Sequence, residues 1–201
     1  MAMLTMMGRR KGNYMNEDAV EKVIRYITRT RPNEDRADEL IAWSGMGVGC
    51  YASPELVIEQ FRAVQEAYGI KAKGGRRIYH EVLGIREGEF ERMWRDYGLV
   101  YQIAAECAKS YYSMGHQVVF AIHHAPKDSQ TGNSGVHIHF AVNTVNFMTG
   151  RRWHSYFRES YNREQDFNRN MRYKVVERII EPLYFADPLL DPITDPFMYP
   201  I

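Results

Sequence analysis

The sequence has little cysteine and no long apolar run, and both absences exclude whole classes of protein. Its two cysteines, Cys50 and Cys107, provide neither a disulfide framework nor a cysteine zinc site. No apolar run approaches the roughly 18 residues that suggest a membrane-spanning helix. The Met-rich start of the chain has no apolar core of signal-peptide length. We therefore expect a cytoplasmic protein without membrane insertion.

The sequence also has almost no net charge, with 26 Lys and Arg against 25 Asp and Glu. This balance excludes a simple polycation, so any nucleic-acid site must be a local basic patch. A chain of 201 residues, 45% of them hydrophobic, is long enough for one domain with its own core. We assign that domain to residues 1–180. Residues 181–201 hold five of the eight prolines and no basic residue, which predicts an acidic tail packed on the domain or on a partner.

Residues 117–146 carry the pattern on which the functional interpretation depends. Two runs rich in β-branched residues, Val118–Ile122 and Val136–Val145, flank a polar connection that contains glycine. Apolar runs separated by such a connection predict two adjacent antiparallel strands.

Histidines gather on these two strands. His137 and His139 point the same way, because side chains alternate between the faces of a strand. His123 and His124 end the first strand, and one of them can close the cluster. We choose His123, because His124 faces the other way if the strand is regular. Three neutral imidazoles with open remaining positions suit a divalent metal that must also bind substrate.

Helical and strand patterns alternate through the rest of the chain. We expect helices over residues 16–30, 53–69, 88–114 and 162–180, and a strand over residues 76–85. Residues 33–43 are interpreted as a short helix, followed by a flexible Gly-rich connection. Helices packed on one face of an antiparallel sheet predict the α+β class and a two-layer sandwich.

The histidine pattern resembles the metal motif of relaxases, the mobilisation nucleases of the HUH endonuclease superfamily. Their motif is a first His that ends a strand, then His-x-His, then an apolar run that ends in Asn, often followed by Thr-Gly. Here the matching letters are AIHH and HIHFAVNTVNFMTG. The match is specific over residues 118–150 and weaker over residues 17–30 and 76–85.

The chain departs from the family pattern at two places. Many relatives have Asp at the next position but one after the first His, whereas Ala125 follows His123 and Pro126 follows His124 here. The identity of the first ligand therefore stays open between these two histidines. Gly84 stands where the family often has Ser.

The resemblance implies an HUH-type sandwich with the two metal strands in the middle, and Mg²⁺ or Mn²⁺ as the cofactor, although three imidazoles also suit Zn²⁺ or Ni²⁺. It implies site- and strand-specific nicking of single-stranded DNA at a transfer origin, in the bacterial cytoplasm. This reaction serves plasmid mobilisation and conjugation, a route of horizontal gene transfer. Accessory DNA-binding proteins and a conjugative coupling protein are the implied partners. The chain is either a minimal relaxase or the nuclease domain of a larger one.

The resemblance also assigns the nucleophile to a tyrosine near the N-terminus. One branch of the relaxases carries it in a segment similar to VIRYITR, which gives this role to Tyr26. Its attack would leave a 5′-phosphotyrosyl bond, which stores the energy for later rejoining, and a free 3′-hydroxyl. Tyr14 is the main competing candidate, with Tyr51 and Tyr161 behind it.

Polar residues near the matched segments are expected to support the site. The expected DNA-binding residues are Arg25, Arg29, Arg76, Arg77, Asn143, Arg151 and Arg152. His80 and Glu81 point to opposite faces of their strand, so either can be the hydrogen-bond partner of a metal-binding histidine.

Three other functions are alternatives. A rolling-circle replication initiator shares the superfamily chemistry but acts at a replication origin. A metal phosphoesterase would use water as the nucleophile and would leave no covalent protein–DNA adduct. A non-enzymatic DNA-binding module would bind equally well in the presence of a chelator.

Overall fold

The computed structural model describes residues 3–6, 14–31, 38–49, 52–68, 75–125 and 135–153. The strands are β1 (Met3–Met6), β2 (Glu39–Met46), β3 (Ile78–Arg86), β4 (His116–Ala125) and β5 (Gly135–Asn146). The helices are α1 (Ala19–Ile27), α2 (Pro54–Ala67), α3 (Glu87–Arg92) and α4 (Tyr97–Ser113). Among the described residues, no helix is long and apolar enough to cross a membrane.

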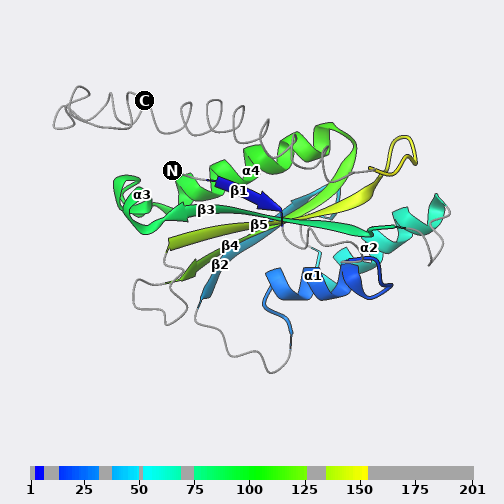
Figure 1. The fold of residues 1–201 in the computed structure, drawn as a ribbon, viewed down its shortest axis with the longest axis horizontal. Helices are drawn as coiled ribbons and strands as arrows, with labels where there is room; N and C mark the ends of the chain where they lie inside the picture. The colour runs from blue at the N-terminus through cyan, green and yellow to red at the C-terminus, as the bar shows by residue number, and fades with distance from the viewer. Residues whose placement is uncertain are drawn as a thin grey trace.

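The strands form one antiparallel sheet in the order β1-β3-β5-β4-β2 (Figure 1). β4 and β5 are neighbours, and His123 pairs with His137 across them. The predicted antiparallel pairing of these two strands is therefore confirmed. β5 is the central strand, flanked by β3 and β4, and most of its residues are buried.

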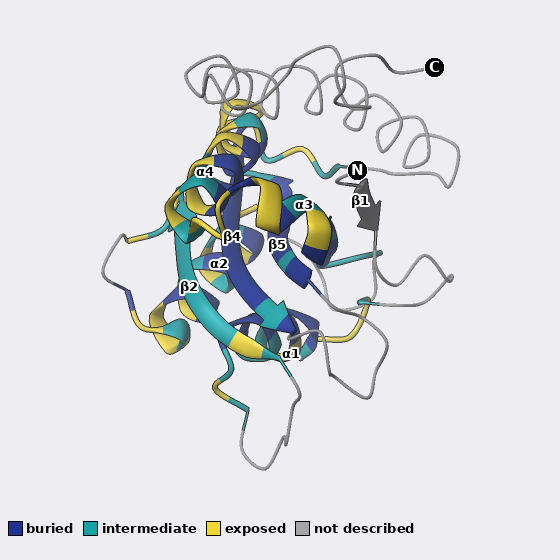
Figure 2. Ribbon diagram, turned by 90° about the vertical axis from the view of Figure 1, so that its left-hand side faces the viewer, coloured by how far each residue is buried: buried dark blue, intermediate teal, exposed yellow. Residues whose placement is uncertain are grey.

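Helices cover both faces of the sheet: α1 and α2 lie on one side, α3 and α4 on the other (Figures 1 and 2). The α+β class and the central antiparallel sheet with helices packed on it are confirmed. The helices form two layers around the sheet rather than the single layer that we expected. Large residues such as Phe140 face α4, whereas small residues such as Ala121 and Ala141 face α1 and α2. A central strand with apolar side chains on both faces needs cover on both faces.

Local signals in the sequence explain the two helices nearest the histidines. The buried residues of α1 include Val20, Val23, Ile24 and Ile27, the spacing of one helical face. α2 starts with Pro54 at its first position, and the hydroxyl of Ser53 accepts a hydrogen bond from the Leu56 N–H.

Two predictions about secondary structure are wrong. Part of the segment 33–43, expected as a helix, belongs to strand β2, which pairs with β4 at one edge of the sheet. The long helix predicted over residues 88–114 is divided into α3 and α4, because Trp94 and Arg95 take positive φ angles of 52° and 55°. Asp96 then caps α4 by accepting a hydrogen bond from the Gly98 N–H at 2.6 Å. The expected helix over residues 162–180 and the acidic tail lie outside the described residues.

Two apolar residues of α2, Phe61 and Leu56, provide a test of how the layer of α1 and α2 packs on the sheet. Phe61 is fully buried, whereas 44% of Leu56 is exposed. We expect Phe61→Ala to lower the free energy of unfolding by about 3–5 kcal/mol, because it leaves a cavity between α2 and the sheet. Leu56→Ala, the matched control, should change it by about 0.5 kcal/mol or less. Urea unfolding followed by circular dichroism measures both, and equal losses would contradict this packing.

Candidate active site

Four histidines lie on the face of the sheet that α1 covers. His80 comes from β3, His123 from β4, and His137 and His139 from β5. His123 pairs directly with His137, and its ring centroid lies 4.4 Å from that of His139. The rings of His80 and His139 are stacked with centroids 5.2 Å apart. Strand alternation thus brings together histidines that are far apart in the sequence.

His124 lies on the opposite face of the sheet from His123. Its Nδ1 is 2.6 Å from the hydroxyl of Tyr97, and its Nε2 is 3.1 Å from a carboxylate oxygen of Glu87. Because β4 stays regular through Ala125, the two adjacent histidines point in opposite directions. Of the two candidates for the first ligand, the geometry places only His123 beside His139.

Hydrogen bonds determine which nitrogen of His123 carries the proton. Its Nε2 lies 2.7 Å from the carbonyl oxygen of Ile27, which can only accept, so Nε2–H is the donor. In the neutral ring, Nδ1 then holds a lone pair. That lone pair accepts an N–H of Arg29 at 2.9 Å.

A second chain of hydrogen bonds runs through His80. Its Nε2 lies 3.0 Å from Nδ1 of His139, and its Nδ1 lies 3.4 Å from the hydroxyl of Tyr14. His80 and Glu81 are the two expected hydrogen-bond partners of a metal-binding histidine, and His80 is the one that contacts His139. Glu81 points to the other face, where it accepts a hydrogen bond from Tyr111.

Burial favours the uncharged form of three of these imidazoles, those of His80, His137 and His139. Desolvation lowers the pKa of His80 from 6.5 to about 4 and lowers the pKa of His139 well below 6.5. Burial also lowers the pKa of His137, and the carboxylate of Asp38 acts in the opposite direction. Neutral imidazoles have the lone pair that a metal ligand needs.

Tyr26 lies directly over this face. It belongs to α1, and its ring meets those of His80 and His139 edge-on, with centroids 5.6 Å away in each case. The guanidinium of Arg29 lies 5.5 Å from the centroid of the Tyr26 ring. Tyr14, the main competing candidate, contacts His80 through its hydroxyl. Tyr51 and Tyr161 lie outside the described residues.

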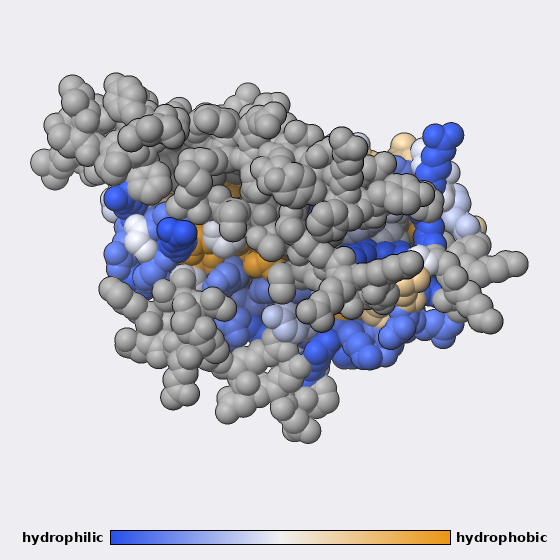
Figure 3. Space-filling model, in the orientation of Figure 1, coloured by the Kyte–Doolittle hydropathy of each residue, from blue (hydrophilic) through white to orange (hydrophobic). Residues whose placement is uncertain are grey.

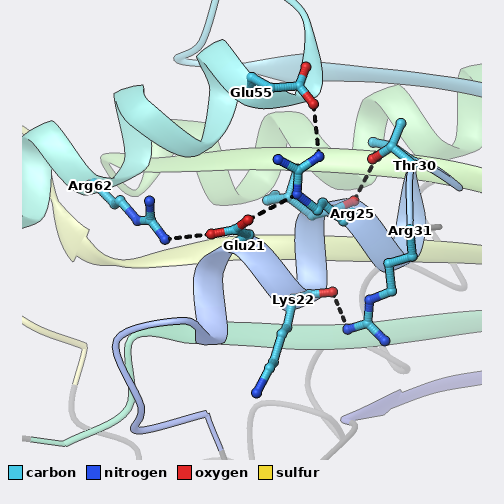
Figure 4. Close-up of polar contacts among 9 residues, drawn as sticks. Glu21, Lys22, Arg25, Thr30, Arg31, Glu55 and Arg62 are labelled. Carbon is cyan, nitrogen blue, oxygen red and sulfur yellow. Dashed lines mark hydrogen bonds and ion pairs between the residues drawn. The ribbon is translucent and has the colours of Figure 1, made fainter.

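The expected DNA-binding arginines do not all lie near the histidines. Arg25 pairs with Glu21 and Glu55, and Arg62 pairs with the same Glu21 (Figure 4). The described surface on the side of α1 and α2 is mainly hydrophilic (Figure 3).

Arg77, Arg151 and Arg152 lie at the other end of the sheet, where Arg77 bonds the Gln65 side chain. Arg76 lies nearer the histidines, because its guanidinium is 5.5 Å from the ring centroid of Tyr14, which contacts His80. Arg152 pairs with Val145 and bonds the carbonyls of Gly75 and Arg76. At about 3.3 Å per residue, Val145 is roughly 20 Å along β5 from His139. The expectation that Arg151 and Arg152 emerge beside the histidine pair is therefore corrected: β5 continues too far before the chain turns.

Asn143 is corrected as a DNA-binding residue, because it is fully buried. Its amide nitrogen donates to the Phe61 carbonyl at 3.1 Å and to the Gln117 side chain at 2.8 Å. Its amide oxygen accepts from Gln65 at 3.0 Å. These bonds join α2 to β4 and β5, so Asn143 holds the helix layer on the sheet.

Asp38 is a site residue that sequence reasoning missed. It precedes β2, where Leu40 pairs with His123, and it forms an ion pair with Arg29. Its Oδ2 lies 3.4 Å from Nδ1 of His123. The interpretation of residues 33–43 as a helix concealed this contact, which depends on the pairing of β2 with β4.

The histidine face has the donor chemistry of a divalent-metal site. Neutral imidazoles from His123, His137 and His139 suit Mg²⁺ less well than Mn²⁺, and they leave positions open for substrate. Within the described ranges, no three His, Cys, Asp or Glu side chains are already arranged to hold an ion. The nitrogens of His123 are instead engaged with Arg29 and Ile27, and Nδ1 of His139 is engaged with His80.

Comparison with protein families identifies a nuclease domain over residues 26–174, described as Relaxase: MobA/VirD2-like, nuclease domain. The matched range begins at Tyr26 and includes all four histidines of the site. The chain therefore belongs to the relaxase family of mobilisation nucleases, which nick DNA and generally depend on a divalent metal. Neither the curated proteins nor the solved structures contain a significant match.

The low pKa of His80 predicts how the stability of the metal-free protein depends on pH. Between pH 6.5 and about 4 the unfolded chain binds a proton that the folded protein excludes. The free energy of unfolding should therefore fall as pH decreases through this window, by roughly 3 kcal/mol for His80 alone. Urea unfolding in the presence of a chelator measures it. His80→Gln should make the dependence shallower, and an unchanged slope would contradict the burial of a neutral His80.

Proposed function

We propose that this protein is a DNA relaxase that nicks single-stranded DNA at a specific site and strand by transesterification to Tyr26. The observation that carries the proposal is the position of the Tyr26 ring, 5.6 Å from the ring centroids of both His80 and His139. A nucleophile must lie beside the group that activates the phosphate. Tyr26 lies beside the imidazoles, on the same face of the sheet.

His123, His137 and His139 are the residues that would hold a divalent ion, Mg²⁺ or Mn²⁺. When bound, such an ion polarises the phosphate and stabilises the charge that develops on it. His80 would fix the orientation of His139 through the bond between their ring nitrogens at 3.0 Å. If His139 binds through Nε2, its Nδ1–H donates to His80, and His80 in turn donates to Tyr14.

The hydroxyl oxygen of Tyr26 would attack the phosphorus and lose its proton. The P–O bond to the 3′ oxygen breaks and that oxygen takes up a proton, which balances the one lost from Tyr26. The upstream strand therefore leaves with a free 3′-hydroxyl, and the downstream strand stays on Tyr26. One phosphodiester replaces another, so no nucleotide cofactor is needed and the reaction can be reversed. Arg29, beside Tyr26 and His123, is the arginine best placed to hold the phosphate.

The family match supports a wider role in conjugation. We propose that the substrate is the transfer origin of a plasmid or conjugative element in the bacterial cytoplasm. Accessory DNA-binding proteins and a coupling protein are the proposed partners. Arg77, Arg151 and Arg152, at the far end of the sheet, would contact the strand away from the nick. Arg76, beside the Tyr14 ring, would contact it nearer the site.

Tyrosine variants test the nucleophile. Wild-type protein incubated with Mn²⁺ and labelled transfer-origin single strand should give an adduct that survives denaturing electrophoresis. Tyr26→Phe removes only one oxygen, so DNA binding should persist while cleavage and adduct both disappear. Tyr97→Phe, on the opposite face of the sheet, is the matched control and should keep both. His139→Ala should lose the reaction together with Mn²⁺ binding measured by calorimetry.

Each of the other outcomes has a defined meaning. Cleavage without an adduct in the wild type would identify water as the nucleophile and the protein as a phosphoesterase. An adduct in Tyr26→Phe that disappears in Tyr14→Phe would transfer the role to Tyr14. Mass spectrometry of the digested adduct identifies the modified residue directly.

A further inference from the structure

A guanidinium lies where the histidine face would have to receive a cation. α1 ends at Ile27, and Arg29 takes a left-handed backbone conformation with φ of 57°, after which its side chain turns onto the sheet. There it forms an ion pair with Asp38 and donates to Nδ1 of His123 at 2.9 Å. The side chains of Arg29 and Asp38 are only 16% and 25% exposed. Arg29 is thus a largely buried cation beside the imidazoles.

The protonation of His123 makes this contact significant. Because Nε2–H is committed to the carbonyl of Ile27, only Nδ1 has a lone pair to offer an ion. That lone pair is the one that Arg29 covers. An ion can therefore bind His123 in this orientation only after the guanidinium has moved.

The carboxylate of Asp38 also lies close to Nδ1 of His123. Its Oδ2 is 3.4 Å from Nδ1 of His123, so the two atoms could share one ligand between them. Its carboxylate also acts on His137, where it opposes the effect of burial on the pKa. An oxygen ligand beside imidazoles suits Mg²⁺ or Mn²⁺ better than imidazoles alone.

We propose that Asp38 is a carboxylate ligand of the divalent ion, and that Arg29 occupies the place of the ion at His123 until a DNA phosphate withdraws its guanidinium. This inference rests on the proposed function of the histidine face. It adds a ligand that the His motif does not contain, and it couples the binding of metal to the binding of DNA.

Electrostatics gives the direction of the coupling. Arg29 and a divalent ion repel each other at short range, whereas Arg29 binds a phosphate through two parallel N–H bonds. Moving Arg29 to the phosphate uncovers Nδ1 of His123 and releases Asp38 to the ion. Each ligand should then strengthen the binding of the other by the same factor.

The test measures Mn²⁺ affinity by calorimetry, with and without a saturating decathymidylate strand as the phosphodiester probe. In wild-type protein the strand should tighten Mn²⁺ binding by about 5- to 150-fold, the usual range of coupling between two sites. Arg29→Gln should bind Mn²⁺ about tenfold more tightly without the strand, because the cation is gone, and should gain little when the strand is added. Asp38→Asn should bind Mn²⁺ about 10- to 100-fold more weakly under both conditions.

Arg62→Gln is the matched control, because it removes a guanidinium from an ion pair with Glu21 away from the histidines. Its Mn²⁺ affinities should equal those of the wild type. Circular dichroism checks folding, and Arg29→Lys serves as a second variant. It keeps the charge but cannot bridge both partners, so it should raise Mn²⁺ affinity without the strand by a smaller factor.

Several results would overturn the inference. Unchanged Mn²⁺ affinity in both Arg29 variants would show that the guanidinium does not occupy the ion's place. An undiminished gain from the strand in Arg29→Gln would mean that the phosphate binds the ion directly. Wild-type affinity in Asp38→Asn would remove the carboxylate ligand. By contrast, failure of the wild type to bind Mn²⁺ even with the strand present, or equal binding by His139→Ala, would overturn the proposed metal function itself.

Discussion

The register between β4 and β5 determines the chemistry of this protein. With His123 opposite His137, the alternation of β5 also brings His139 to the face beneath α1. A shift by one residue would turn His137 and His139 toward α4 and bring Phe140 and Ile138 to the face of Tyr26. The apolar residues of β5 oppose such a shift, because Phe140 and Ile138 belong to the core beneath α4. The same residues thus stabilise the fold and orient the imidazoles.

Burial of the histidine face beneath α1 has an electrostatic consequence. Low solvent access lowers the pKa of His80, His137 and His139 and so favours their neutral forms, whereas Arg29 beside them carries a positive charge. Asp38 compensates that charge, and removing either partner of such a pair leaves an uncompensated charge in a poorly solvated place. The site therefore holds a balanced ion pair beside neutral ligands.

The sequence predicted the parts of the site that depend on local periodicity. The alternation HIH and the apolar stripe of α1 were enough to expect the histidine face and a helix that carries Tyr26. Asp38 could not be predicted, because its position depends on the pairing of β2 with β4 across a long separation in the chain. Residues 33–43, which include Asp38, contain helix-forming residue types, and the pairing of β2 with β4 overrides their helix propensity. The α3–α4 break similarly depends on positive φ angles at Trp94 and Arg95, residue types that carry no such signal.

Spacing along a strand also explains the misplaced polar residues. Asn143 shares the face of His139, and sequence alone cannot distinguish a polar residue that faces a ligand from one that bonds a helix such as α2. Arg151 and Arg152 follow β5 closely in sequence, but an extended chain carries them far from the histidines within a few residues. Proximity in sequence equals proximity in space only within one turn or one hairpin.

The central claim is that one face of the sheet holds both the divalent ion and Tyr26. Fluorine NMR of protein labelled with 3-fluorotyrosine, titrated with Mn²⁺, tests it directly, because a paramagnetic ion broadens the signals of nearby rings most. Tyr→Phe variants assign the signals. The account predicts the strongest broadening at Tyr26 and much weaker broadening at Tyr68, whose hydroxyl bonds the Phe147 carbonyl beyond the far end of β5. Broadening of Tyr68 as strong as that of Tyr26, or none at Tyr26, would contradict it.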